Sequence, residues 1–360
     1  MTIAVLIVNW NSGPLLAECL QALRRQVRAP DHVIVVDNAS SDGSMEVAAR
    51  FLRDAEVIRL GSNVGFARAN NLAARAAARF DALALLNPDA FAEPEWLRAL
   101  TEAAACRPEF AAFASQMRLA SAPERLDGAG DSYHVSGRAW RVGHGSPAAE
   151  WRTGDSEVFA ACAAAALYRR GPFEEVGGFD ERYFCYFEDV DLGFRLRLRG
   201  YRCLYVHAAV VRHVSSASAG YRGDFAVYHG ERNAVWTWVK NMPAPLLWLY
   251  LPQHLLLNAA ALAYYAFRGQ GLVALRAKFD ALKGLPETLR DRRAVQRARR
   301  VSVRELRRAM SRGLAAPYLA RYSGIEASGL APRPRSHQSA LAGSPRAGCS
   351  GGSARGRRAS

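Results

Sequence analysis

Two clusters of polar residues in this sequence could carry out chemistry. The first consists of acids and amides that closely follow short apolar runs: Asn9, Asp37, Asn38, Asn87 and Asp89. Carboxylates and amides can hydrogen-bond the base and ribose of a nucleoside, and carboxylates can hold a hard divalent cation against its phosphates. The same residue types also form turns and helix caps, so the N-P-D segment on its own has both interpretations.

The second cluster lies between residues 177 and 192, where five acids within twelve residues are interleaved with aromatic side chains. Aromatic faces beside carboxylates are typical of sugar-binding sites, and burial among aromatics makes a carboxylate a stronger base. Acids at the start of a helix also have a purely structural explanation, because they interact favourably with the helix dipole. For Asp191 that explanation includes an i,i+4 ion pair with Arg195.

A sheet must bring these clusters together. The first hundred residues alternate β-branched runs with amphipathic patterns, which is typical of a parallel sheet with helical crossovers. Ligands of such sheets bind at the carboxyl ends of the strands, where the first cluster lies. The pattern predicts strands at 3–8, 33–36, 57–60 and 82–86, and helices at 15–24, 44–52, 66–80 and 94–105.

The second half of the chain is predicted to add further strands before it becomes helical at residue 224. Residues 120–157 read as an irregular excursion or hairpin, and strands are expected at 158–168, 201–206 and 209–214, with a helix at 188–199. His213 ends the last of these strands. A lone histidine is most often structural, and His213 becomes a ligand candidate only if the fold brings it to Asp89.

Several function classes are poorly supported by the motifs. The sequence contains neither a G-x-G-x-x-G after its first strand nor a G-x-x-x-x-G-K-[ST], which argues against dinucleotide and P-loop sites. Its six cysteines are scattered without a C-x-x-C pair, so a zinc site or a disulfide framework is not expected. The apolar start lacks a basic region and a cleavage site, which predicts a buried strand in a protein of the cytosol or its membrane face.

The charge is unevenly distributed. Of the formal net charge of +15, residues 1–289 contribute +1 and residues 290–360 contribute +14. The part of the chain that can build a core is therefore neutral, which argues against a nucleic-acid-binding protein. The last thirty residues, 331–360, also contain no Phe, Tyr or Trp on which bases could stack.

Residues 244–267 form an uncharged run that is long enough to span a bilayer. Spanning, seating at the membrane interface and a soluble helix pair are all compatible with this run, and we favour interfacial seating because prolines and polar residues interrupt it. The Arg-rich stretch that follows would favour anionic lipid headgroups.

These motifs together resemble the family 2 inverting glycosyltransferases of GT-A fold, in their rhamnosyltransferase-like branch. The resemblance covers about residues 1–310 and includes the E-R-N segment at 231–233. It rests on V-I-V-N-W-N, with V-V-D-N-A-S-S-D-G-S, N-V-G-F-A-R-A-N-N, L-L-N-P-D and G-G-F-D-E-R-Y-F-C-Y-F-E-D-V-D-L, in this order and spacing.

The resemblance implies roles for individual residues. It places Asp89, where the family has its D-x-D motif, and His213 as ligands of Mg²⁺ or Mn²⁺, and it makes Asp189 the base, beside Glu188. The residues implied in nucleotide-sugar binding are Asn9, Asp37, Asn38, Asn63, Gly65, Phe66, Asn71 and Asn87. Those implied on the acceptor side are Phe179, Asp180, Tyr186 and Asp191.

The implied reaction is coherent, because inversion needs one carboxylate to deprotonate the acceptor hydroxyl, while a metal neutralises the leaving diphosphate. The implied donor is a nucleoside-diphosphate sugar, with dTDP-rhamnose favoured. The implied acceptor is a glycan or lipid-linked glycan of a bacterial cell surface, reached from the inner face of the cytoplasmic membrane.

Two other functions stay open at this point: a nucleotidyltransferase that makes sugar nucleotides, and a non-catalytic membrane-bound subunit of glycan assembly. The expected organisation is a GT-A domain at 1–225, a helical membrane-associated region at 226–312 and a disordered tail at 313–360.

Overall fold

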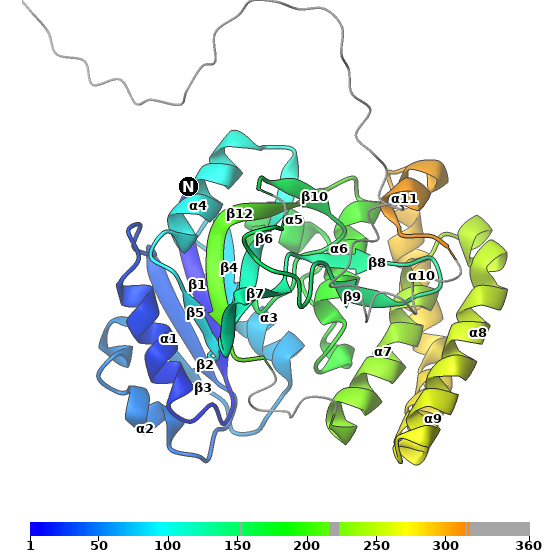
Figure 1. The fold of residues 1–360 in the computed structure, drawn as a ribbon, viewed down its shortest axis with the longest axis horizontal. Helices are drawn as coiled ribbons and strands as arrows, with labels where there is room; N and C mark the ends of the chain where they lie inside the picture. Colours follow the sequence, from blue (N-terminus) through cyan, green and yellow to red (C-terminus); the bar gives the residue numbers. More distant parts are fainter. Residues whose placement is uncertain (152, 216–222, 314–315, 317–360) are drawn as a thin grey trace, which may run out of the picture. The chain divides into compact units, whose positions relative to one another are not determined.

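The computed structural model describes residues 1–151, 153–215, 223–313 and 316, so nearly all of the expected tail lies outside the described residues. The described residues all belong to one compact unit. The domain boundary expected after residue 225 falls inside helix α7 (Asp224–Asn241). Figure 1 shows a mixed sheet followed by a group of helices.

The first four strands form the expected parallel sheet, in the order β4-β1-β2-β3. Their bounds are β1 Ile3–Asn9, β2 His32–Asp37, β3 Glu56–Arg59 and β4 Ala82–Leu86. Every residue of β1 and β4 is buried, and side chains alternate between the two faces, as strand geometry requires. Val5 and Ile7 therefore belong to one core, and Leu6 to the other.

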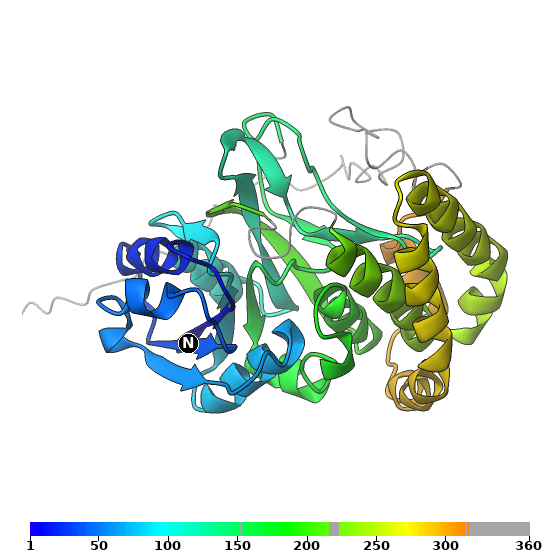
Figure 2. The same cartoon turned by 90° about the horizontal axis from the view of Figure 1, so that it is seen from below.

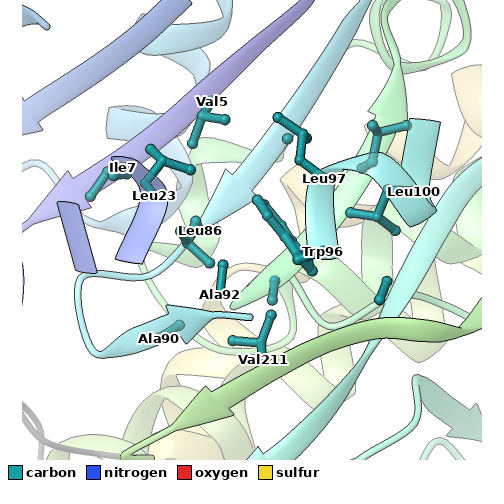
Figure 3. Packing of buried hydrophobic residues seen from close by; sticks show 14 of the residues in the cluster. Val5, Ile7, Leu23, Leu86, Ala90, Ala92, Trp96, Leu97, Leu100 and Val211 are labelled. Carbon is teal, nitrogen blue, oxygen red and sulfur yellow. The ribbon is translucent and has the colours of Figure 1, made fainter. Parts of the chain in front are cut away.

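Helices cover both faces of this sheet. On one face lie α1 (Leu15–Arg24), α2 (Ser44–Ala48) and α4 (Trp96–Cys106), with Trp96 and Leu97 packed near Val5 (Figure 3). On the other lie α3 (Phe66–Ala76), α5 (Arg170–Glu175) and α6 (Glu188–Leu198). A short 3-10 turn, η1 (Leu52–Asp54), stands where the second expected helix was to end.

The sheet continues beyond β4 with strands of mixed direction, in the order β10-β12-β6-β11-β4, while β5 pairs with β12 and β7 with β6. The bounds are β5 Ala90–Ala92, β6 Phe110–Leu119, β7 Ala122–Gly128, β10 Ser156–Val158, β11 Ala165–Arg169 and β12 Arg202–His213. A separate hairpin consists of β8 (Asp131–Tyr133) and β9 (Ala139–Arg141).

Two sequence predictions are corrected here, and a third strand is new. The long strand expected at 158–168 is two short strands, β10 and β11, separated by irregular chain. The two strands expected at 201–206 and 209–214 are one strand, β12, whose register against β6 shifts between Val206 and Val210. Strand β6 was not predicted, because its Ala-rich sequence has low β propensity.

The C-terminal helices lie beside the sheet (Figure 2). Helix α7 contacts α6, α9 and α10, and α8 contacts α9 and α11. Among the described residues, α8 is the one helix that is long and apolar enough to cross a membrane, by length and composition alone. The bounds are α7 Asp224–Asn241, α8 Ala244–Phe267, α9 Gly271–Lys283, α10 Leu285–Arg297 and α11 Val303–Ala309.

Candidate active site

Asn9 and Asp37 lie opposite each other at the ends of β1 and β2. The buried Asn9 amide donates to Ser40 Oγ at 3.0 Å and to Ser44 Oγ at 2.9 Å, while its oxygen accepts a hydrogen bond from Ser12. Asp37 Oδ1 accepts a hydrogen bond from Ser40 N at 3.0 Å. Both ends of the Asn9 amide are therefore used inside the protein, and Asn9 shapes the loop after β2.

Asn38 and Asn63 connect the loops after β2 and β3. Asn38 Nδ2 donates to Asn63 Oδ1 at 2.8 Å, and Asn38 Oδ1 accepts from Val64 N at 2.9 Å. Gly65 follows with a φ of +86°, and a Cβ there would lie 2.6 Å from the ring of Phe184. This position needs glycine both for its backbone conformation and for the close approach of Phe184.

Asn71 and Phe179, which were expected on the donor and acceptor sides, are bound to each other. Asn71 Oδ1 accepts from Phe179 N at 2.9 Å, and Asn71 Nδ2 donates to Phe179 O at 2.8 Å. The Phe179 ring is buried and meets Phe66 edge-on at 6.2 Å. These residues therefore attach the 177–192 segment to helix α3, which begins at Phe66.

Asp89 and His213 are brought together by the sheet. Strand β5 pairs antiparallel with β12, with Ala90 opposite His213, and His213 Nε2 lies 3.3 Å from Asp89 Oδ1. Asn87, partly exposed, stands two residues before Asp89, at the end of β4. The condition that the sequence set for His213 is therefore met.

Asp127 is a member of this group that the sequence analysis missed. Its carboxylate, fully buried at the end of β7, accepts a hydrogen bond from His213 Nδ1 at 2.8 Å and also binds Arg141. Burial opposes protonation of His213, but the carboxylates of Asp127 and Asp89 outweigh it and raise the pKa of His213. Asp127 lies in residues 120–157, where no motif marked it.

This geometry fits a divalent cation. Metal-ligating histidines usually give their second ring nitrogen to a carboxylate, as His213 Nδ1 gives its own to Asp127. The other nitrogen, Nε2, is buried and lies 3.3 Å from Asp89 Oδ1, in poor hydrogen-bond geometry within the described part of the chain. Asp89 and His213 could therefore supply one oxygen and one nitrogen ligand.

Glu188 and Asp189 begin helix α6. Asp189 Oδ2 accepts from Ala163 N at 3.1 Å, and Oδ1 accepts from Val190 N at 2.8 Å. Glu188 is buried, and its Oε2 has no hydrogen-bond partner among the described residues. Desolvation by the surrounding protein raises the pKa of both carboxyl groups, and the charge of Asp189 raises that of Glu188 further.

Asp131 is a second carboxylate close to Asp189. Asp131, Cys162 and Asp189 each offer a ligand atom, and these atoms lie within 4.8 Å of one another. Burial raises the pKa of Asp131 and of the Cys162 thiol. The thiol of Cys162 makes this ligand set a poor match for Mg²⁺ or Mn²⁺, which prefer oxygen ligands.

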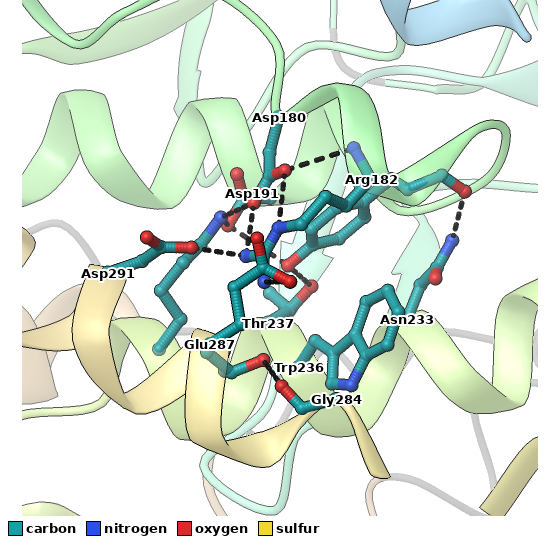
Figure 4. A network of polar contacts seen from close by, with 12 residues as sticks. Asp180, Arg182, Asp191, Asn233, Trp236, Thr237, Gly284, Glu287 and Asp291 are labelled. Atoms are coloured by element: carbon teal, nitrogen blue, oxygen red, sulfur yellow. Dashed lines mark hydrogen bonds and ion pairs between the residues drawn. The ribbon is translucent and has the colours of Figure 1, made fainter. Parts of the chain in front are cut away.

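Asp180 and Asp191, which were expected on the acceptor side, have a different environment (Figure 4). Lys240 Nζ lies 2.7 Å from Asp180 Oδ2 and 2.8 Å from Asp191 Oδ1. Asp180 also pairs with Arg182, and Asp191 forms the i,i+4 ion pair with Arg195. Through Lys240, Asp191 of α6 and Asp180 are both tied to α7, and their place on the acceptor side stays a prediction.

Tyr186 lies in the turn before α6, at a φ of +67°. Next to it, Phe187 lines a cavity of about 190 Å³ whose other walls come from α7, α8, α9 and the β8–β9 turn. Polar groups in this cavity include His254, Asn258 and Glu231, and Glu231 pairs with Lys278 at 2.6 Å.

The family model for glycosyl transferase family 2 matches residues 4–177, which include the sheet from β1 to β11. Residues 4–177 therefore form a glycosyltransferase domain of this family. It is 29% identical over 301 residues to the N-acetylglucosaminyl-diphospho-decaprenol L-rhamnosyltransferase of Mycobacterium tuberculosis, a match that covers 71% of this chain and 93% of that protein. It is also 28% identical to the O-antigen chain rhamnosyltransferase RfbN of Salmonella typhimurium, over 59% of this chain and 66% of that protein.

Two solved structures show the same GT-A fold. GalNAc-T7 with UDP, GalNAc and Mn²⁺ superimposes with a TM-score of 0.53 at 16% identity, covering 69% of this chain and 50% of that chain. The mannosyltransferase PcManGT from Pyrobaculum calidifontis, in complex with GDP-Man and Mn²⁺, gives a TM-score of 0.50 at 21% identity. This match covers 82% of this chain and 85% of that chain. The glycosyltransferase is thus rhamnosyltransferase-like in sequence and GT-A in fold.

Proposed function

We propose that this glycosyltransferase moves rhamnose from dTDP-rhamnose, with inversion, to a hydroxyl group of a lipid-linked or cell-surface glycan. The observation that carries the proposal is the contrast in the 177–192 segment: among the described residues Glu188 and Asp189 form no ion pair, although the charge of Arg141 acts on Asp189, whereas their neighbours Asp180 and Asp191 are paired. The rhamnosyl group and the lipid-linked acceptor are inferred from the names of the two relatives.

Asp189 is the proposed base. Its backbone hydrogen bonds from Ala163 and Val190 fix the orientation of the carboxylate at the start of α6. Desolvation raises its pKa, so the ionised form is a stronger base toward an acceptor hydroxyl than an exposed aspartate would be. One base is enough, because the leaving diphosphate needs charge neutralisation and not a proton.

Asp89 and His213 are the proposed ligands of Mg²⁺ or Mn²⁺. When bound, the cation would neutralise negative charge on the leaving diphosphate. Asp127 holds the ring of His213 so that Nε2 faces the cation site. Asp37 and the loops fixed by Asn9, Asn38 and Asn63 form the proposed nucleoside side of the pocket.

The acceptor is proposed to approach from the membrane surface along α8 and α9. These helices expose large apolar side chains, with Trp248 70%, Phe267 93% and Leu272 84% exposed. Basic residues stand among them, which suits a bilayer with anionic headgroups. Flotation with anionic vesicles should carry the wild-type protein upward, and Trp248→Ser with Leu272→Ser should weaken that binding; equal flotation would contradict the membrane proposal.

The donor assignment is tested by calorimetry with dTDP-, UDP- and GDP-sugars in the presence of Mn²⁺, followed by transfer assays with the donor that binds. We expect the dTDP-sugar to bind best and EDTA to stop transfer reversibly. Full activity of the chelated enzyme would remove Asp89 and His213 from the metal role, and preference for another nucleotide would overturn the donor. Release of pyrophosphate from a nucleoside triphosphate would instead favour a nucleotidyltransferase.

A further inference from the structure

Asn233, in the E-R-N segment on α7, binds the aromatic turn at residues 183–187, which precedes α6. The proposed reaction assigns Asn233 no role. The side chain is fully buried. Its Nδ2 lies 2.9 Å from Tyr183 O, 2.9 Å from Cys185 O and 2.8 Å from Tyr186 O. An amide nitrogen carries two hydrogens, so three carbonyl groups converge on it and share them.

Arg232 determines which way this amide points. Arg232 Nε donates to Asn233 Oδ1 at 3.0 Å, and its Nη2 donates to the carbonyl groups of Arg182 and Tyr183 at 3.2 and 3.1 Å. A guanidinium group can only donate hydrogen bonds, so the amide oxygen must face Arg232. The amide nitrogen of Asn233 is therefore directed at the turn.

The turn needs such support because its backbone is unfavourable. Phe184, Tyr186 and Phe187 have φ values of +64°, +67° and +68°, in the left-handed region that bulky L residues rarely adopt. Conformations of this kind persist where the surrounding contacts impose them. The carbonyl groups that Asn233 binds lie within the same turn, so its amide supplies part of that constraint.

The turn also contacts the donor loop at one end and leads into the proposed base at the other. At one end, Phe184 O accepts a hydrogen bond from Ala67 N at 3.2 Å, and the Phe184 ring packs against Gly65 of the donor loop. At the other end, Phe187 directly precedes Glu188 and Asp189. A change in the turn would therefore alter the position of the base relative to the donor loop.

We infer that Asn233 is a positioning residue for catalysis: by holding residues 183–187 it sets the placement of the Asp189 carboxylate against the donor loop at residues 63–67. The inference rests on the proposed function in that it takes Asp189 as the base. It predicts that loss of the Asn233 amide lowers the rate of transfer while the donor still binds, since small misplacements of reacting groups are costly in rate.

The test compares Asn233→Ala and the isosteric Asn233→Asp with a matched control, Asn241→Ala. Asn241 is equally buried on the same helix, but its amide binds Asp191 and Thr237 and none of the turn's carbonyl groups. We expect kcat to fall about 10²-fold in the Asn233 variants, with donor KM nearly unchanged. The Asn241 variant should lose thermal stability and keep its kcat.

Equal loss of kcat in the Asn233 and Asn241 variants at equal loss of Tm would overturn the inference, because it would mark Asn233 as merely structural. Retention of kcat in both Asn233 variants would also overturn it. A double-variant cycle separates this inference from the proposed function: in an Asp189→Asn background, Asn233→Ala should cause little further loss. Full transfer by Asp189→Asn alone would count against the base assignment and not against the contacts of Asn233.

Discussion

Two pairs of carboxylates within one twelve-residue segment have opposite electrostatic surroundings. Asp180 and Asp191 share Lys240, with Arg182 and Arg195 beside them, and these cations outweigh burial and lower the pKa of both carboxyl groups. Glu188 and Asp189 are also desolvated and form no ion pair among the described residues; the charge of Arg141 opposes the shift at Asp189, but desolvation outweighs it and the pKa values of both groups are raised. The comparison shows that acid density alone does not mark a catalytic site, since the position of the cations decides which acids are available to act as a base.

The largest loss of activity is expected when the carboxylate of Asp189 is replaced by a neutral amide. Asp189→Asn keeps the size of the side chain and removes its capacity to accept a proton, so transfer should fall by about 10²- to 10⁴-fold. Donor binding by calorimetry should stay near the wild-type value, because Asp189 is not among the proposed nucleotide ligands. Retained turnover in this variant would assign the base elsewhere.

Removing the cation that Asp180 and Asp191 share should lower the stability of the protein. Lys240→Met leaves the buried Asp191 and the partly buried Asp180 without their shared cation, which should cost up to about 3 kcal/mol of unfolding free energy in urea denaturation, because Arg182 and Arg195 still pair with them. Lys283→Met serves as the control, since Lys283 is largely exposed and lies 3.9 Å from Asp280; its loss should stay below about 1 kcal/mol. Similar stability of the two variants would show that the Lys240 ion pairs are not structural.

The smallest effect is a displacement of the pH profile. Transfer requires ionised Asp189, whose pKa is raised, so kcat/KM should decline on acidification at a higher pH than an ordinary aspartate would give. Asp131→Asn removes a neighbouring carboxyl group and should move this acid limb to lower pH. Asp180→Asn should leave the limb in place, and movement of the limb by both variants would mean that the two groups of acids are not separate.

The sequence predicted the parts of the fold that depend on local patterns. The apolar runs of β1 and β4, and the uncharged run of α8, identify elements whose burial or composition is visible in a short window. The pairing of Asp89 with His213 was foreseen only as a condition, because it depends on the antiparallel contact of β5 with β12.

Residues that act through distant partners were beyond prediction. Asp127 gains its role from His213, 86 residues away, and no local motif marks it. The family resemblance placed Asp180 and Asp191 on the acceptor side, but their shared ion pair with Lys240, which follows 60 and 49 residues later on another helix, could not be predicted. In each case the contact that determines the surroundings of the carboxylate is tertiary, and the pattern of a single sequence cannot predict it.

The register shift in β12 bears on how this enzyme can change in length during evolution. Val206 pairs with Ser115 of β6 and Val210 with Gln116, so residues 207–209 are extra in β12, and the pairing continues in the shifted register as far as His213. An added or deleted residue at such an irregularity can be absorbed locally, whereas a one-residue slip after it would turn His213 to the opposite face of the sheet. We therefore expect insertions and deletions among homologues to collect at residues 207–209 and to be absent from residues 210–213.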